Sequence, residues 1–231
     1  MEQTLKITGV LSDPTRYYIY KYISQKHSDV TVQEIADEFN IHPNVARLHL
    51  SKLEDVNMLT SETKKTGKGG RPSRLYALSE DVIQLQFPFR DYRTLAQIAC
   101  NSLLSLGKIG EEALYETGKQ FGKEIMTQHL HRLNIDETEL TIEQKVQIAK
   151  EVLSTAGLSP AFELNIKDGK VFYEVHNCPF KEVAVQHPKE MCAMHGNMMK
   201  GIFEVLFSNI ELTRQDNILD GCKSCNYRLS I

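Results

Sequence analysis

The sequence predicts an α+β protein made of a helix-and-hairpin domain, a helical middle region and a small mixed domain. Three observations predict this layout. Two short helical patterns joined by a tight turn precede a basic, glycine-rich hairpin within residues 31–78. Helical periodicity then dominates, and period-two alternation follows in the last third, together with four of the five cysteines. We therefore expect domains at residues 1–85, 86–157 and 158–231.

The composition is that of an ordinary globular chain. Of the 231 residues, 41% are hydrophobic and 25% are charged, and the formal net charge is −3 with a pI of about 6.3. If the chain binds nucleic acid, its positive charge must therefore be local. No apolar run approaches the roughly 18–20 residues that span a bilayer, and the N-terminus lacks the pattern of a signal peptide. We expect a cytoplasmic protein with no membrane partner, whose reduced thiols favour metal or redox chemistry over disulfides.

Two helix starts are visible in the first 40 residues. Asp13 and Pro14 supply an N-cap acid and a proline at the first helical position. The helix that they start should pack inward through Tyr18, Ile19, Tyr22 and Ile23. Thr31 and Glu34 form a capping-box pattern before a second, shorter helix with an apolar face.

Pro43 opens a third helix after a short turn, and this helix should extend to about Asn57. Its inward positions are Ala46, Leu50 and Leu53, and its opposite face carries Asn44, Arg47, Leu48 and Ser51. In a helix-turn-helix protein the second helix enters the major groove of DNA by its N-terminal half. Asn44 and Arg47 suit base edges, and Ser51 suits a phosphate or a base. The alternative is a solvated polar face in a helical bundle.

A basic hairpin follows this helix. Residues 58–63 and 75–78 are strand candidates, and the segment between them is rich in glycine and contains no acid. Its cations are Lys64, Lys65, Lys68, Arg71 and Arg74. A hairpin of this kind is typical of a wing that contacts the phosphate backbone or the minor groove, although charge runs also occur as solvated loops. We therefore predict a winged helix-turn-helix that binds double-stranded DNA.

The same region resembles a known family. The stretches HPNVARLHLSKLEDVNML, GRPSRLYALSED and FPFRDYRTLAQI (residues 87–98) resemble the winged-helix regulators of the ArsR/DeoR-like group, and are most similar to the SufR type. The most specific part is Gly70-Arg71-Pro72 followed by Leu75-Tyr76. The resemblance implies a repressor that senses an iron–sulfur cluster. Because helix-turn-helix proteins usually bind two half-sites, we also expect a homodimer on a palindromic operator.

Three further helices are predicted in the middle region. The first runs from Tyr92 to about Leu106, and Cys100 on it should be a core thiol because no other ligand type is near. Its buried face should consist of Leu95, Ile98, Ala99, Leu103 and Leu106. The second spans about residues 110–133, with Leu114, Phe121, Ile125 and Leu130 on its apolar side. The third begins at another capping-box pattern, at Thr141. These helices are candidates for dimer contacts, because helix-turn-helix proteins usually bind two half-sites as dimers. Nothing in the sequence separates a dimer surface from a core.

The last third predicts a small α+β domain. Two alternating runs, residues 161–166 and 171–175, flank Asp168-Gly169 and indicate a β-hairpin. A short helix and a longer one, residues 189–207, come next. Residues 209–212 and 227–231 are further strand candidates.

Four cysteines in this domain are the candidate sensor: Cys178, Cys192, Cys222 and Cys225. The last two form a Cys-x-x-Cys, which places two sulfurs on one side of a tight turn. Four thiolates satisfy a tetrahedral zinc ion and equally a two- or four-iron cluster. The alternative is four buried core thiols, since cysteine is among the residues most often buried. Spare ligand candidates are His195, His187 and His176.

The SufR resemblance extends more loosely into this domain. SufR-type proteins carry a cysteine-proline-aromatic segment, a cysteine on the next helix and further cysteine near the C-terminus. Cys178-Pro179-Phe180, Cys192, and Cys222 or Cys225 stand at matching places. The resemblance implies an iron–sulfur cluster, with zinc as the alternative, and the complete terminal Cys-x-x-Cys departs from the pattern.

Two other functions stay open on the sequence. One is a winged-helix regulator that senses an organic ligand or thiol oxidation without a metal. The other is a thiol oxidoreductase with a fused helical domain. A redox Cys-x-x-Cys should open a helix after a strand, whereas this one leads into a strand candidate. The chain also lacks the spacing of a catalytic triad or a nucleotide fingerprint. We therefore expect a regulator and not an enzyme.

Overall fold

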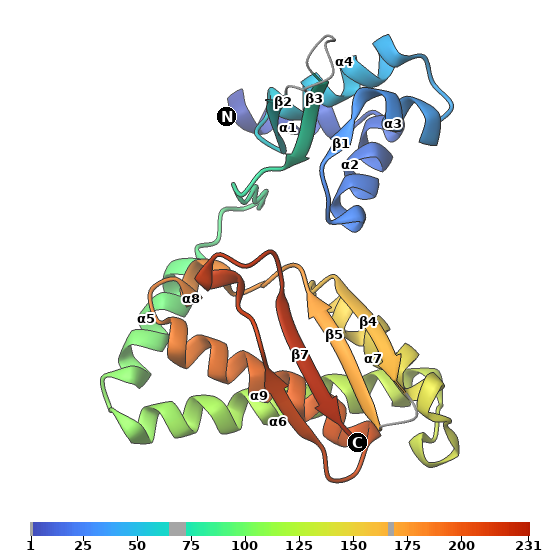
Figure 1. The fold of residues 1–231 in the computed structure, drawn as a ribbon. Helices are drawn as coiled ribbons and strands as arrows, with labels where there is room; N and C mark the ends of the chain where they lie inside the picture. The colour runs from blue at the N-terminus through green and yellow to red at the C-terminus, as the bar shows by residue number, and fades with distance from the viewer. Residues whose placement is uncertain (1, 65–72, 166–168) are drawn as a thin grey trace. The chain divides into compact units, whose positions relative to one another are not determined.

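The structure, a computed structural model, describes residues 2–64, 73–165 and 169–231. The chain divides into two compact units, residues 1–90 and 91–231, each with its own hydrophobic core (Figure 1). The helices of the middle region belong to the same unit as the C-terminal sheet. The predicted α+β class, with an N-terminal helix-turn-helix, is confirmed.

The N-terminal unit is a small helical domain with a three-stranded sheet. Its elements are α1 (Glu2–Leu11), α2 (Pro14–Lys26), β1 (Val30–Thr31), α3 (Val32–Glu38), α4 (Pro43–Glu54), β2 (Leu59–Lys64) and β3 (Ser73–Leu78). The strands pair antiparallel in the order β1-β3-β2, so both strands of the predicted wing hairpin are present. Within this unit α1 is an addition that the sequence patterns did not indicate.

The inward faces of α2, α3 and α4 form the N-terminal core. Asp13 caps α2 by accepting a hydrogen bond from the Arg16 N–H at 3.1 Å. The side chains at most 1% exposed include Ile19, Ile23, Ile35 and Leu50. Tyr18, expected on the inward face, is 57% exposed, so that part of the prediction is wrong. Neighbouring residues lie about 100° apart around a helix, and of this pair Ile19 faces the core while Tyr18 faces outward.

The capping box predicted for α3 is half formed. The Thr31 side chain caps the helix by accepting a hydrogen bond from the Glu34 N–H at 3.1 Å. The Glu34 carboxylate accepts a hydrogen bond from the Tyr22 hydroxyl at 3.2 Å and pairs with Lys26. Glu34 therefore links α3 to α2, and its carboxylate binds these residues of α2 instead of the backbone N–H of Thr31.

The C-terminal unit contains five α-helices and a four-stranded sheet within the described residues. Its elements are α5 (Tyr92–Leu104), α6 (Lys108–Leu133), η1 (Glu137–Glu139), α7 (Ile142–Thr155), β4 (Pro160–Asn165), β5 (Lys170–Val175), α8 (Lys181–Ala184), α9 (Pro188–Leu206), β6 (Glu211–Arg214), η3 (Ile218–Asp220) and β7 (Cys225–Ser230). The strand order is β4-β5-β7-β6, and every pair is antiparallel. Figure 1 shows α6, α7 and α9 on one face of this sheet.

Alternation along β5 explains why the sheet has one buried face. Val171, Tyr173 and Val175 are at most 2% exposed, while the residues between them face away from the helices. The Tyr173 ring stacks on Tyr227 at 5.0 Å and on Phe162 at 5.1 Å, between ring centroids. The predicted hairpin is thus confirmed in β4 and β5, although Asp168 of its turn lies outside the described residues.

Glycines let α6 and α9 approach closely. A Cβ atom added at Gly122 would lie 1.9 Å from the Met198 carbonyl oxygen, and one added at Gly201 would lie 2.0 Å from that of Lys119. Both neighbours are backbone atoms, so a side chain at either position would force the helices apart. This contact fixes the place of α9, which carries part of the cysteine site.

The face of α5 that was expected to be buried is exposed. Leu95 is 60% exposed, Ile98 58% and Leu106 62%, and no residue of α5 is buried. Phe121 on α6, also expected inward, is 56% exposed. These predictions of burial are wrong for the single chain: among the described residues α5 packs mainly on α6 and α8, and these side chains stay exposed. Cys100 is half-buried, with its sulfur 4.0 Å from that of Met191.

Candidate functional site: a nucleic-acid face and a cysteine cluster

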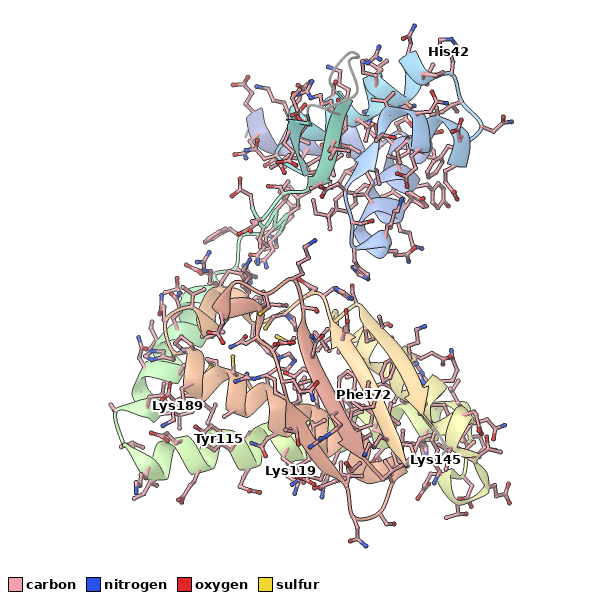
Figure 2. The ribbon with its side chains drawn as sticks, in the orientation of Figure 1. His42, Tyr115, Lys119, Lys145, Phe172 and Lys189 are labelled. Carbon is pink, nitrogen blue, oxygen red and sulfur yellow. The ribbon has the colours of Figure 1, made fainter. Side chains whose placement is uncertain are left out.

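Helix α4 separates a buried face from an exposed polar one. Its inward residues, Ala46, Leu50 and Leu53, have no measurable exposure. His42 caps the helix by accepting a hydrogen bond from the Asn44 N–H at 3.2 Å, at the turn before α4 (Figure 2). Arg47 donates a hydrogen bond to the Asn44 side chain at 3.1 Å, and both residues are exposed. The two side chains predicted to contact base edges therefore lie together on the accessible side of the helix.

Two apolar side chains share this exposed face. Leu48 is 55% exposed and Val45 is 41% exposed, while Ser51 is half-buried. Sequence reasoning missed Val45, although its position one residue after Asn44 on the helix could have indicated it. Apolar contacts of such residues with thymine methyl groups are a common part of base recognition.

The described part of the wing is tied to α4 by Arg74. Its guanidinium donates hydrogen bonds to both carboxylate oxygens of Glu54 at 2.8 and 2.9 Å and to the Ser61 hydroxyl at 2.7 Å. It also lies over the Tyr76 ring, 5.3 Å from the centroid. Arg74 is therefore engaged within the domain, and its predicted contact with DNA stays a prediction. Lys65, Lys68 and Arg71 lie outside the described residues, as does the side chain of Lys64.

Four of the five cysteines of the C-terminal unit lie near one end of its sheet. Cys178 follows the end of β5, and Cys225 begins β7 directly opposite Val175 in the strand register. Cys192 lies near the start of α9, and Cys222 follows η3. Antiparallel pairing of β5 with β7 thus brings together residues that are far apart in the sequence. We call Cys178, Cys192, Cys222 and Cys225, with His195, the cysteine cluster.

A buried amide connects two of these sulfurs. Asn217, which is 8% exposed, donates a hydrogen bond from Nδ2 to the Cys192 sulfur at 3.8 Å. The Cys225 thiol donates to Oδ1 of the same amide at 3.7 Å, and the Ile218 N–H donates to the Cys225 sulfur at 3.3 Å. The Arg214 side chain lies near Cys192, and the two residues line the same pocket. Asn217 and Arg214 were missed by sequence reasoning, because neither belongs to a motif with the cysteines.

A second pair in the cluster joins a thiol to a buried imidazole. The Cys178 sulfur lies 3.8 Å from Nδ1 of His195, whose ring meets the Phe180 ring edge-on with centroids 5.1 Å apart. Burial, with the charge of Arg214 second, lowers the pKa of His195 to about 4. Burial also raises the pKa of the Cys178 thiol to about 11. Both groups are therefore neutral near pH 7.

The donor atoms of the cluster have the chemistry of a metal site without its geometry. Thiols and a neutral imidazole are the ligands that zinc and iron–sulfur clusters use, and Nε2 of the buried His195 has no hydrogen-bond partner within the described structure. Yet no three His, Cys, Asp or Glu side chains among the described residues are grouped closely enough to hold one metal ion. Ligation of one ion by several of them would need side-chain rotation. Cys222, the exposed member, is the freest to rotate.

The other two histidines named from the sequence have different surroundings. Nε2 of His187 lies 2.6 Å from the Asn101 side-chain oxygen, which joins the start of α9 to α5. Nε2 of His176 lies 3.3 Å from the Glu174 carboxylate. His195, by contrast, lies against the sulfur of Cys178.

Comparison with known proteins gives two family matches. Residues 11–62 match a helix-turn-helix domain, and residues 95–229 match the family described as L-2-amino-thiazoline-4-carboxylic acid hydrolase. No curated protein matches the chain. No helix in the described parts of the chain has the length and apolar character needed to cross a membrane.

Two solved structures show weak similarity. One is a trafficking protein particle complex subunit 3 from Naegleria fowleri covalently bound to palmitic acid, with a TM-score of 0.43, 11% identity, and coverage of 60% of this chain and 95% of that one. The other is the phenol-responsive sensory domain of the transcription activator PoxR with phenol, with a TM-score of 0.45, 14% identity, and coverage of 79% and 88%. At these TM-scores neither establishes a shared fold. The hydrolase-family match spans more than half of the chain, and the chain therefore belongs to the L-2-amino-thiazoline-4-carboxylic acid hydrolase family, with a helix-turn-helix domain preceding the matched region.

Proposed function

We propose that this chain is a DNA-binding transcriptional regulator, acting as a repressor, whose C-terminal unit reads a chemical signal at the cysteine cluster. The DNA-binding part is supported by the helix-turn-helix match and by the exposed pair Asn44 and Arg47 on α4. The observation that carries the sensing part is the convergence of four cysteines and a buried imidazole at one end of a sheet.

An iron–sulfur cluster, or in its place a zinc ion, is the proposed occupant. Cys178, Cys192, Cys222 and Cys225 would hold it through their thiolates, with His195 as a further ligand candidate. An iron–sulfur cluster would supply sensitivity to oxidants or to iron supply, whereas zinc would supply a structural link. What the chain's own residues contribute is the N–H donors of Ile218 and Asn217, which stabilise negative charge on Cys225 and Cys192. Gain or loss of the occupant can alter DNA binding only if the DNA-binding state and the non-binding state of the protein differ in affinity for that occupant.

A homodimer is part of the proposal, and the uncovered side of α5 is its proposed contact. Residues 94–107 contain no charged residue. Tyr92, Leu95 and Ile98 on this helix are between 58% and 62% exposed. Charge depletion with exposed aromatic and aliphatic side chains is the composition of interface cores. A second copy of the chain fits this surface, because a helix-turn-helix needs two copies to read a palindromic operator.

The family's name suggests a second candidate, hydrolysis of L-2-amino-thiazoline-4-carboxylic acid, which the match of residues 95–229 favours. A cysteine nucleophile must be a thiolate, usually beside a charged imidazole. Cys178 and His195 form the thiol–imidazole pair of the cluster, but burial raises the pKa of Cys178 to about 11 and lowers that of His195 to about 4. Both stay neutral at pH 7, so this pair lacks the thiolate that a cysteine nucleophile needs. Incubation with the compound should leave it unchanged, and turnover lost in Cys178→Ser would establish the enzyme instead.

The proposal is tested by anaerobic purification of the full chain, followed by metal and sulfide analysis and an absorbance spectrum. Wild type is compared with Cys178→Ser and Cys225→Ser, and with Cys100→Ser as the matched control outside the cluster. We expect iron and sulfide, or zinc, in wild type and the control, and loss of it in both cluster variants. Operator binding is then measured for the loaded and stripped protein. Equal metal content in all four proteins would contradict the ligand assignment, and a metal-free wild type whose DNA binding responds to an oxidant would establish thiol sensing without a metal.

A further inference from the structure

A basic pocket lies between α9 and the edge of the C-terminal sheet. Its volume is about 460 Å³, and α9 forms one wall while β6 and β7 form the other. The lining residues that matter are Lys189, Gly196, Asn197, Lys200, Leu212 and Arg214. No acidic residue lines it among the described parts of the chain. We call this space the α9 pocket.

The cations of the α9 pocket come from two elements that face each other. Lys189 and Lys200 stand eleven positions apart, which is three helical turns, so both lie on the same side of α9. Figure 2 shows Lys189 near the start of this helix. Arg214 ends β6 on the opposite wall. A ligand in the pocket would therefore meet positive charge from both sides.

Most of this charge is not neutralised within the protein. Lys200 has a distant partner, Glu204, at 3.9 Å. For Lys189 and Arg214, no carboxylate lies within ion-pair distance in the part of the chain that the structure describes, and the Arg214 side chain has the thiol of Cys192 as a neighbour. Cations that share a cavity without carboxylate partners repel one another, and a bound anion removes that repulsion. Arginine also presents a planar pair of donors that matches a carboxylate or phosphate group.

Gly196 adds a second, independent observation. It lies inside α9, where glycine is unfavourable relative to alanine. The close approach of α6 explains Gly201 on the same helix, but a Cβ atom added at Gly196 would meet nothing within 4 Å. Helix packing therefore gives no reason for this glycine. Its effect is to leave the α9 pocket open on the helix side.

We propose that the α9 pocket binds a small organic anion, with a carboxylate or phosphate group between Arg214 and Lys189. The volume exceeds that of an inorganic ion and is within the range of pockets for small organic ligands. The Asn197 amide provides a neutral hydrogen-bonding group, and Leu212 provides a short apolar surface. Because Cys192 lines this pocket together with Arg214, the pocket and the cysteine cluster share a residue. The binding site itself does not depend on the proposed DNA-binding function.

Isothermal titration calorimetry of the full chain, without DNA, tests this site with two probes, citrate and glycerol 3-phosphate, at constant ionic strength in chloride. Gly196→Met fills the pocket without a clash against the fold, and Arg214→Gln and Lys189→Gln remove charge. The matched controls are Gly9→Met, at another helical glycine with open space, and Lys150→Gln on α7. Melting temperature and circular dichroism confirm that each variant is folded.

We expect saturable binding of at least one probe near one per chain, and the stronger probe shows whether the site prefers carboxylates or phosphate esters. Gly196→Met should abolish it, and each charge variant should weaken it by about tenfold or more, while both controls bind as wild type does. Binding that survives in folded Gly196→Met, or equal weakening in Lys150→Gln, would overturn the site. So would the absence of binding by both probes at millimolar concentration. The metal content of the protein is measured separately, so failure of the metal proposal and failure of the anion site can be distinguished.

Discussion

Glycine-to-alanine substitution at three positions tests the helix packing of the C-terminal unit with opposite expected signs. At Gly122 the new Cβ would lie 1.9 Å from the Met198 oxygen and 2.8 Å from its carbonyl carbon. At Gly201 it would lie 2.0 Å from the Lys119 oxygen. Ordinary contacts begin near 3.4 Å, so α6 and α9 would have to separate by more than one ångström in either variant. At Gly196 the new methyl group meets open space.

The magnitudes follow from two opposing terms. Alanine in a helix interior is favoured over glycine by about 1 kcal/mol. Overpacking a core costs about 1–3 kcal/mol, and a clash with rigid backbone belongs at the upper end. We therefore expect Gly122→Ala and Gly201→Ala to lose about 2 kcal/mol of unfolding free energy, and Gly196→Ala to gain about 1 kcal/mol. For a unit of this size these changes correspond to about 2–8 °C in melting temperature, with opposite signs.

The assay is thermal and urea unfolding of the full chain, followed by near-ultraviolet circular dichroism. The stacked Tyr173 and Tyr227 rings contribute to this signal from the C-terminal core. Gly9→Ala, with nothing within 4 Å of its added Cβ, serves as a control in the N-terminal unit. If Gly122→Ala melted no lower than wild type, or if Gly196→Ala melted lower than Gly122→Ala, the packing argument would be refuted.

Four further variants test DNA contact, dimer formation and the stability of the N-terminal unit. Arg47→Ala should relax base preference at one or two positions, with a loss of about 1–3 kcal/mol in the free energy of binding. Equal losses on specific and random DNA would contradict this role of Arg47. Lys68→Ala should instead weaken binding to all sequences and flatten its salt dependence. Leu95→Glu combined with Ile98→Glu should convert a dimer to a monomer in analytical ultracentrifugation, and an unchanged sedimentation coefficient would exclude this face of α5. Burial lowers the pKa of His49, against the opposing charge of Asp13 at 3.9 Å, so the unfolded chain binds the proton more readily. The N-terminal unit should therefore lose stability as pH falls below about 6.5, and a urea midpoint whose pH slope is the same in His49→Leu would count against this cause.

Local signals in the sequence predicted most elements of the fold. Asp13, Pro43 and Thr141 mark helix starts through caps and prolines, and the structure places helices directly after each of them. Thr141 and Gln144 form a complete capping box. These devices act within one turn of helix, so they are visible without tertiary structure.

Burial was less predictable where it depends on a distant partner. Leu95 and Ile98 have the spacing of a core face, and periodicity cannot say whether the partner is another element or another chain. On α6, the buried positions include Gly118, Gly122 and Met126, while Phe121 is exposed. A helix that packs through glycines breaks the expectation that large apolar residues mark the inward side, because the tight approach leaves no room for them.

The cysteine cluster also has a part that the sequence predicted and a part that depends on tertiary contacts. Cys-x-x-Cys and the concentration of thiols near the C-terminus were visible as spacing, and the structure gathers them at one end of the sheet. Asn217, Arg214 and the contact of His195 with Cys178 arise from the pairing of β5 with β7 and from the position of α9, which no local pattern encodes. Residues that support a site through tertiary contacts alone lie beyond single-sequence reasoning.

Cys192 is the residue at which the two proposed sites meet. Its sulfur accepts a hydrogen bond from Asn217 on the side of the cysteine cluster, and it lines the α9 pocket together with Arg214. An anion that engages the Arg214 guanidinium offsets the positive charge that lies beside Cys192, so anion binding and occupancy of the cluster should be coupled. Linkage requires this coupling to be reciprocal: if citrate lowers metal affinity by some factor, bound metal must lower citrate affinity by the same factor. Because Arg214→Gln removes this charge, the two affinities should become independent in that variant even where each single affinity is reduced. Coupling that persisted unchanged in Arg214→Gln would show that the sites communicate by another route, or that Cys192 belongs to only one of them.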